Sequence, residues 1–400
     1  MHYLRRISTR RLLALCLGVV LAAAGGTAIA IAATSGGPKP APKPLAQALH
    51  DAATAPAVQG VSARIQFTNH LIDSSNLGEG ADPLLAGASG RLWATKDRLR
   101  LELQTTGGAG DSQILVDNGR FTVYDAGAHT VYTGTLPAGR QDATSSQKQD
   151  QPPTAADIQK KLDELMKDAS VSGAVPSDVA GHPAYTVRIG PKHDGGLLGG
   201  AELAWDAVRG VPLRAAIYAK GSSSPVLELK ATQISFGKVD GSVFAITPPS
   251  DAKVVDLAPK QEQQGAAGSG ASKPMPVEGA SAVQAKLPFT LAAPSSLGGK
   301  PLSGVRLISS DRHPAALVTY GQGLGGFAVI ESQAQSGAQS AQSLGDRGGL
   351  KLPSVSIGGA SGNELQTALG TALTFERGGV SYVVLGSAPA DAVAAAARAL

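Results

Sequence analysis

Short runs of alternating apolar and polar residues fill the stretch from Gly90 to Pro137. Leu99, Leu101 and Leu103 alternate with charged residues, so this run has one apolar and one charged face. Residues 117–119 read Asp-Asn-Gly between two further runs, and these residues tolerate the positive φ of a two-residue hairpin turn. The pattern predicts consecutive antiparallel hairpins with one apolar face.

A helix is predicted after these strands, and its apolar side could pack against the apolar face of the sheet. Thr154 and Asp157 have the spacing of a capping box, which predicts a helix from there to Asp168 with one apolar stripe. We therefore expect a cavity between sheet and helix. Its candidate hydrophobic lining is Trp93, Leu99, Leu101, Leu103, Ile114, Val116, Phe121, Val123, Ile158, Leu162 and Leu165. For Trp93, ordinary core packing is the competing interpretation, since a core and a cavity wall use the same residue types.

The remaining patterns extend the sheet and predict an α+β fold. A short helix is expected at 45–55, and a strand at 61–69. Further strands are expected at 184–189, 201–206, 213–219, 226–236 and 243–247. Few helices among many consecutive strands are typical of an antiparallel α+β domain.

Composition divides the chain into segments. Residues 34–44 form a Pro-rich spacer, and residues 259–282 form a low-complexity linker of small and polar residues. Between and after them we expect a first domain at 45–258 and a smaller C-terminal α+β domain at 283–400.

The smaller domain contains a glycine-rich run that invites a phosphate-loop interpretation. Residues 321–326 resemble such a loop, but the residues after them continue as a strand, so a hairpin turn is expected there. An Ala-rich helix from Pro389 to Leu400 ends the chain.

Residues 1–33 have the pattern of an export signal or a membrane anchor. Arginines at positions 5, 6, 10 and 11 precede an uncharged apolar run from Leu12 to Ala33. That run is long enough to span a bilayer, so a retained anchor and a cleaved signal both stay open. Either way, the domains are expected outside the cytoplasm, at the cell membrane or secreted.

Charge and reactive residues argue against nucleic acid and against most enzymes. The chain has 35 basic and 31 acidic residues, and its formal charge of +4 equals the four N-terminal arginines. The single cysteine, Cys16, lies inside the apolar N-terminal run, so no thiol remains in the domains. Neither a metal-binding histidine motif nor a nucleophile elbow occurs, and the sequence predicts no catalytic residue, no metal and no cofactor.

Several short motifs together resemble those of the LolA-like lipoprotein carriers. The motifs are G-x-L-W at 90–93, I-L-V-D-x-G at 114–119, V-Y-D at 123–125, T-V-Y with a closing L-P at 130–137, A-x-L-A-W-D at 201–206, G-V-P-L-R at 210–214 and V-F-x-I-T-P-P at 243–249. This resemblance covers about residues 45–250. It implies an antiparallel open half-barrel with capping helices around a cavity for acyl chains.

The two-domain layout is also similar to that of MucB/RseB-type regulators, which the resemblance links to lipid signals and an anti-sigma factor. Two functions follow as hypotheses. One is a non-enzymatic, membrane-tethered protein that binds an acyl chain, lipid or lipoprotein. The other is an envelope sensor that regulates a sigma factor through an anti-sigma partner. A structural envelope scaffold is a third possibility.

Overall fold

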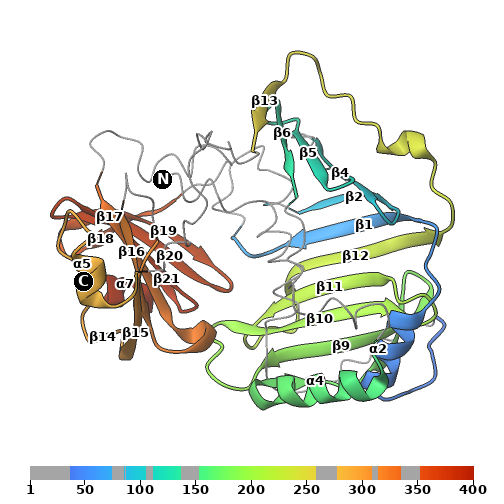
Figure 1. The fold of residues 1–400 in the computed structure, drawn as a ribbon, viewed down its shortest axis with the longest axis horizontal. Helices are drawn as coiled ribbons and strands as arrows, with labels where there is room; N and C mark the ends of the chain where they lie inside the picture. The colour runs from blue at the N-terminus through green and yellow to red at the C-terminus, as the bar shows by residue number, and fades with distance from the viewer. Residues whose placement is uncertain are drawn as a thin grey trace, which may run out of the picture.

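The computed structural model describes residues 37–73, 85, 87–104, 111–136, 153–257, 277–308, 314–334 and 352–400. Two sheets contain the strands of these residues (Figure 1). The predicted N-terminal segment and most of the predicted linker lie outside the described residues, so both remain predictions. Among the described helices, none has the length and apolar character needed to cross a membrane.

The first sheet runs in the order β13-β6-β5-β4-β3-β2-β1-β12-β11-β10-β9-β7, with β8 paired to β9. Its strands are β1 (Val61–Asn69), β2 (Ala88–Ala94), β3 (Arg98–Gln104), β4 (Asp111–Asp117), β5 (Arg120–Asp125), β6 (Thr130–Thr135), β7 (Ala169–Val171), β8 (Val175–Val179), β9 (His182–Pro191), β10 (Leu198–Asp206), β11 (Pro212–Ala219), β12 (Pro225–Phe236) and β13 (Lys253–Asp256). Neighbouring strands are antiparallel except β13, which pairs with β6 in parallel. The α+β half-barrel predicted from the sequence is confirmed: the sheet is open and curled, and β13 and β7 form its two ends.

Local sequence explains where this sheet turns and bends. Asn118 and Gly119 have φ of 45° and 79° between the paired residues Asp117 and Arg120, which is the two-residue hairpin predicted from Asp-Asn-Gly. The register between β1 and β12 shifts at Arg64 and Ile65, and further shifts interrupt the β10–β11 pairing. Such bulges increase local twist and bend the strand, which curls the sheet.

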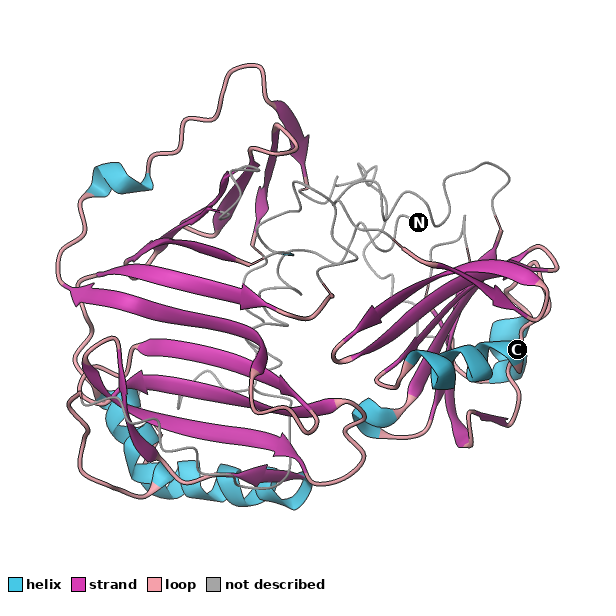
Figure 2. Ribbon diagram, turned by 180° about the vertical axis from the view of Figure 1, so that it is seen from behind, coloured by secondary structure: helices cyan, strands magenta, loops and turns pink. Residues whose placement is uncertain are grey.

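Two helices lie beside the β9 end of the first sheet (Figure 2). Helix α2 (Leu45–Thr54) buries Ala48 against Tyr185, Val187 and Trp205. Helix α4 (Ala155–Asp168) begins with the predicted capping box, in which the Thr154 side chain accepts from the Asp157 N–H and the Asp157 carboxylate accepts from the Thr154 N–H.

The second sheet runs in the order β14-β15-β16-β17-β21-β20-β19-β18. Its strands are β14 (Ser296–Leu297), β15 (Lys300–Leu307), β16 (Ala315–Tyr320), β17 (Phe327–Gln333), β18 (Ser354–Ile357), β19 (Ala360–Thr367), β20 (Gly370–Arg377) and β21 (Val380–Gly386), with helices α5 (Ala280–Gln284) and α7 (Ala390–Arg398). The Ala-rich C-terminal helix, α7, packs Val393, Ala396 and Ala397 into the core of this sheet. The glycine run 321–326 joins the antiparallel strands β16 and β17, as the hairpin prediction requires.

A buried carboxyl group in β17 makes the second sheet sensitive to pH. Glu331 is 0 % exposed, accepts one hydrogen bond from the Ala292 N–H at 2.9 Å, and its other oxygen has no partner among the described residues. Burial raises the pKa of Glu331 from about 4.5 to about 7. The folded state therefore holds a proton that the unfolded chain has lost between these two values, so stability falls as pH rises through this window.

We expect the second sheet to be less stable at pH 8 than at pH 5 by up to about 3 kcal/mol from this group. Glu331→Gln should remove that difference, because the amide does not ionise. Urea unfolding at both pH values measures it, and the exposed Glu376→Gln is the control. An unaltered pH dependence in the Glu331→Gln protein would show that another group is responsible.

Candidate ligand-binding face of the first sheet

Strand register aligns apolar side chains across β1 to β5. Ala63 lies opposite Leu92, Leu92 opposite Leu101, Leu101 opposite Ile114, and Ile114 opposite Val123. Directly opposed residues point to the same side of a sheet. We call the side that carries this row the apolar face, and the other side the polar face.

A second row on the apolar face continues toward the edge of the sheet. Leu99 lies opposite Val116, and Val116 lies opposite Phe121. The Phe121 ring lies across β6 at Gly134, where an added Cβ would come within 2.5 Å of the ring. Gly134 thus lets the aromatic ring lie flat over the neighbouring strand.

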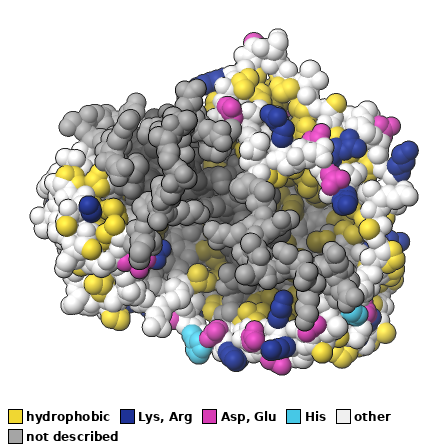
Figure 3. All heavy atoms as spheres, in the orientation of Figure 1, with side chains coloured by type: hydrophobic (Ala, Val, Ile, Leu, Met, Phe, Trp, Pro, Cys, Tyr) yellow, Lys and Arg dark blue, Asp and Glu magenta, His cyan; other side chains and the backbone are white. Residues whose placement is uncertain are grey.

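Most of these side chains are accessible rather than buried. Leu103 is only 2 % exposed and belongs to a core cluster with Ile65 and Ala88. Leu99 and Leu101 are half-buried, as are Ile114, Val116, Phe121 and Val123. In the space-filling view, apolar side chains show in the hollow over the first sheet, with charged side chains around them (Figure 3). The apolar face at β3 to β5 therefore retains apolar surface that a guest molecule can cover.

Trp93 lies on the polar face, apart from the other predicted strand residues. It pairs with Ser62 on β1 and with Arg100 on β3, and the Arg100 guanidinium lies 5.9 Å from the Trp93 ring centre. Leu92, one residue earlier, has the phase of the leucine row. The alternation along residues 90–94 already indicates this placement, since Trp93 is one residue out of phase with Leu92.

The predicted helix residues are also separated from the strand residues. Ile158, Leu162 and Leu165 of α4 are half-buried, and α4 packs on α2 and β7, at the opposite end of the sheet from β3 to β5 (Figure 1). The stripe predicted from periodicity exists, but periodicity does not specify which apolar surface it meets. The helix therefore does not cover the hairpins, contrary to the prediction from the sequence.

The same register reveals members of the apolar face that the sequence analysis missed. Ala63 and Leu92 belong to the leucine row, and Ile65 and Ala88 lie next to it. Pairing between β1 and β2 brings these residues together. The two strands are separated in the sequence by residues 70–87, so their pairing is not evident from the sequence. Their shared signal is the alternation within each strand.

The polar face of β3 is occupied by the segment that follows β12. Arg100 donates to the carbonyl oxygens of Val243 and Ala245 at 2.6 and 2.9 Å, and Arg98 lies 4.7 Å from the buried Phe244 ring. The residues at 241–244 form a 3-10 helix, so the strand expected at 243–247 is wrong. The segment 241–245 thus covers the polar face at β3, and the apolar face is the accessible one there.

The chemistry of the apolar face suits binding rather than reaction. Its rows consist of aliphatic side chains and one phenyl ring, which supply no nucleophile and no acid or base. In the described part of the chain, no group of three or more His, Cys, Asp or Glu side chains is placed to hold a metal ion. The geometry offers area for an apolar guest.

The comparisons with solved structures find several matches at low sequence identity. MucB in complex with MucA(peri) matches over 89% of this chain and 95% of its own, at 14% identity and a TM-score of 0.38. The Pseudomonas aeruginosa MucA/MucB complex matches over 88% and 95%, at 15% identity and a TM-score of 0.39. LprF from Mycobacterium bovis matches over 53% of this chain and all of its own, at 14% identity and a TM-score of 0.25.

The chain is similar to LolA-superfamily proteins with a MucB-type layout. A LolA superfamily protein from Nitrosomonas europaea also matches, over 51% of this chain and 98% of its own, at 10% identity and a TM-score of 0.20. The resemblance inferred from the short motifs is thus confirmed. Structural similarity at these TM-scores does not indicate what the chain binds. No known family description matches the sequence, and no curated protein matches it either.

Proposed function

We propose that this chain is a non-enzymatic binding protein that holds an acyl chain, of a lipid or a lipoprotein, on the apolar face of its first sheet. The observation that carries the proposal is the row Ala63-Leu92-Leu101-Ile114-Val123, which is aligned by register and remains partly accessible. This row crosses five adjacent strands, β1 to β5, which at about 4.8 Å per strand spacing gives a track of about 19 Å.

The energetics favour a flexible hydrocarbon as the guest. Each methylene removed from water contributes about 0.8 kcal/mol. A hydrocarbon chain has no hydrogen-bond donors or acceptors to satisfy, so it suits a surface whose side chains form no hydrogen bonds. A polar ligand would lose its hydration on these leucines without replacement.

Lipid capture tests this proposal. Residues 37–400, stripped of lipid and offered membrane extract, should retain an acyl lipid that mass spectrometry identifies after gel filtration. Serum albumin is a positive control for capture. Recovery of no lipid above a protein blank would contradict the proposal.

Tethering outside the cytoplasm belongs to the same proposal. The support is the basic and apolar pattern of residues 1–33 and the Pro-rich spacer that follows it. A retained segment would keep the apolar face near the membrane from which its guest comes. Protease accessibility of both domains in intact, wall-stripped cells tests this arrangement, and protection of the domains would refute it.

A second candidate function is an envelope sensor in which the second sheet reports on the first to a protein partner such as an anti-sigma factor. Its support is the direct contact between the two sheets. The Leu197 N–H donates to the Ser387 carbonyl at 3.1 Å, and the Ala368 N–H donates to the Leu71 carbonyl at 2.8 Å. Asp194 pairs with Lys300, which lowers the pKa of the Asp194 carboxyl. A change in the first sheet can reach the second through these contacts.

Gly196→Ala should weaken this contact. Gly196 has φ of 62°, and an added Cβ would lie 2.2 Å from the Ser387 carbonyl oxygen, so the loop must move away. We expect a larger radius of gyration by small-angle scattering, with both sheets still folded by circular dichroism. Gly221→Ala, with φ of 77° but nothing near its Cβ, is the matched control.

The sensor candidate adds a binding test. Affinity purification of the full-length protein should recover an envelope protein partner, and Gly196→Ala should reduce its recovery while Gly221→Ala does not. Equal recovery with both variants would contradict signalling through this contact.

A further inference from the structure

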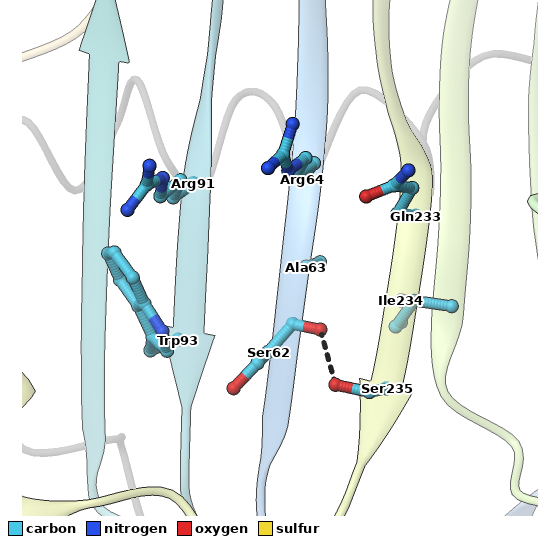
Figure 4. A pocket seen from close by; sticks show the side chains of 8 residues that line it. All are labelled: Ser62, Ala63, Arg64, Arg91, Trp93, Gln233, Ile234 and Ser235. Carbon is cyan, nitrogen blue, oxygen red and sulfur yellow. Dashed lines mark hydrogen bonds between the residues drawn. The ribbon is translucent and has the colours of Figure 1, made fainter.

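A hollow on the polar face of the first sheet lies over β1, β2 and β12, and Ala63 is the one residue it shares with the row proposed to bind an acyl chain. It has a volume of about 480 Å³ and is lined by Ser62, Ala63, Arg64, Arg91, Trp93, Gln233, Ile234 and Ser235 (Figure 4). These residues come from β1, β2 and β12, three adjacent strands held in register by the antiparallel ladder.

Two arginines stand directly opposite each other in this hollow. Arg64 on β1 pairs with Arg91 on β2, and Figure 4 shows their guanidinium groups at the same end of the hollow. Like charges directly opposed on adjacent strands are destabilising. Both side chains are exposed to solvent, and an anion placed between them would relieve their repulsion.

The described residues do not supply that anion. No carboxylate of these residues lies within ion-pair distance of Arg64 or Arg91. Glu102 is the cross-strand neighbour of Arg91, but it forms an ion pair with Arg100 at 2.6 Å. By contrast, Arg188 and Arg214 on the same face each have a carboxylate partner. Arg64 and Arg91 thus share the hollow without a carboxylate partner among the described residues.

The neighbours of the two arginines add hydrogen-bond donors and an aromatic surface. Gln233 lies directly opposite Arg64, and its carboxamide lies beside that guanidinium (Figure 4). Ser62 lies opposite both Trp93 and Ser235, and the Trp93 ring forms one wall of the hollow. Paired guanidinium groups bind the oxygens of a phosphate group in a forked geometry, and amide and hydroxyl groups complete such a site.

We propose that this hollow binds a phosphate group, with Arg64 and Arg91 on its oxygens and Trp93 against the organic part of the ligand. The inference does not depend on the proposed function, because Arg64, Arg91 and Trp93 lie on the polar face, opposite the leucine row. A phosphate group can come from a soluble phosphate ester or from a phospholipid headgroup, and the chemistry of recognition is the same.

The test titrates the full-length protein, held in neutral maltoside detergent, with two phosphate sources. The first is glycerol phosphate, and the second is dihexanoyl phosphatidylglycerol, with dihexanoyl phosphatidylcholine as the zwitterionic comparison. Isothermal calorimetry gives the affinity. Trp93 fluorescence gives a local signal, because the other tryptophan, Trp205, is 3 % exposed.

We expect binding of at least one anionic source, weakened at least tenfold by Arg64→Gln with Arg91→Gln. Lys160→Gln with Lys161→Gln removes the same charge from an exposed part of α4 and should leave the affinity unchanged. Tight binding of the soluble ester identifies a phosphate-ester site, and binding of phosphatidylglycerol alone identifies a headgroup site. Absence of binding, or equal loss with the lysine control, would overturn the proposal.

Discussion

Leu101→Asp is expected to reduce acyl-lipid capture at least tenfold while the first sheet stays folded. Leu101 is at the centre of the leucine row, between Leu92 and Ile114. An aspartate there places a charge where the hydrocarbon would lie, and a charge without a partner is costly to cover. Because Leu101 is half-buried, the folded protein can keep that charge hydrated when no guest is present.

Leu115→Asp provides a matched control for this prediction. Leu115 lies on the adjacent strand β4, is also half-buried, and pairs with Arg100 and Thr122 on the polar face. Both variants should melt within a few degrees of each other, which differential scanning fluorimetry measures. Loss of capture only with Leu101→Asp supports the binding face, whereas equal loss with both variants would show general destabilisation instead.

Arg214→Ala is expected to destabilise the first sheet by about 3 kcal/mol. The Arg214 guanidinium donates to Glu202 and Glu228 at 2.6 Å each, and to the Tyr218 hydroxyl at 2.8 Å. Its side chain is 20% exposed, and those of Glu202 and Glu228 are 17% and 9% exposed. Burial disfavours the arginine charge, but the hydrogen bonds that Arg214 donates to Glu202 and Tyr218 outweigh this effect and raise the Arg214 pKa.

Removal of this one guanidinium would leave two largely buried carboxylates without their main partner. Chemical denaturation followed by far-ultraviolet circular dichroism measures the loss. Arg306→Ala is the control, because Arg306 and Glu278 form an exposed pair, 58% and 54% exposed, whose loss should cost less than about 1 kcal/mol. A loss of similar size in the two variants would show that the buried network contributes no more than a surface pair.

Elements with strong local signals could be predicted from the sequence. The hairpin at 117–120 follows from Asp-Asn-Gly, and the start of α4 follows from the Thr154 capping box. The glycine run after β16 became a hairpin, as its flanking apolar residues indicated. In each case the signal and the structure involve neighbours in the chain.

Features that depend on distant partners were harder to predict. The position of α4 depends on α2, which lies about a hundred residues earlier in the chain. The segment 241–244 has strand-forming residues but folds as a 3-10 helix, because Asp240 caps it and Arg100 binds the carbonyl oxygens around it. The pairing of β1 with β12 and the Arg64–Arg91 juxtaposition likewise arise only from register.

The most direct test of the central claim is to map where an acyl chain lies. A fatty acid with a photoreactive diazirine in its chain, bound to residues 37–400 and irradiated, marks the side chains it touches. Peptide mass spectrometry should find the label at Leu92, Leu101, Ile114 or Val123 and not at Trp93 or Leu115. Label on the polar face, or spread evenly over both faces, would contradict the account.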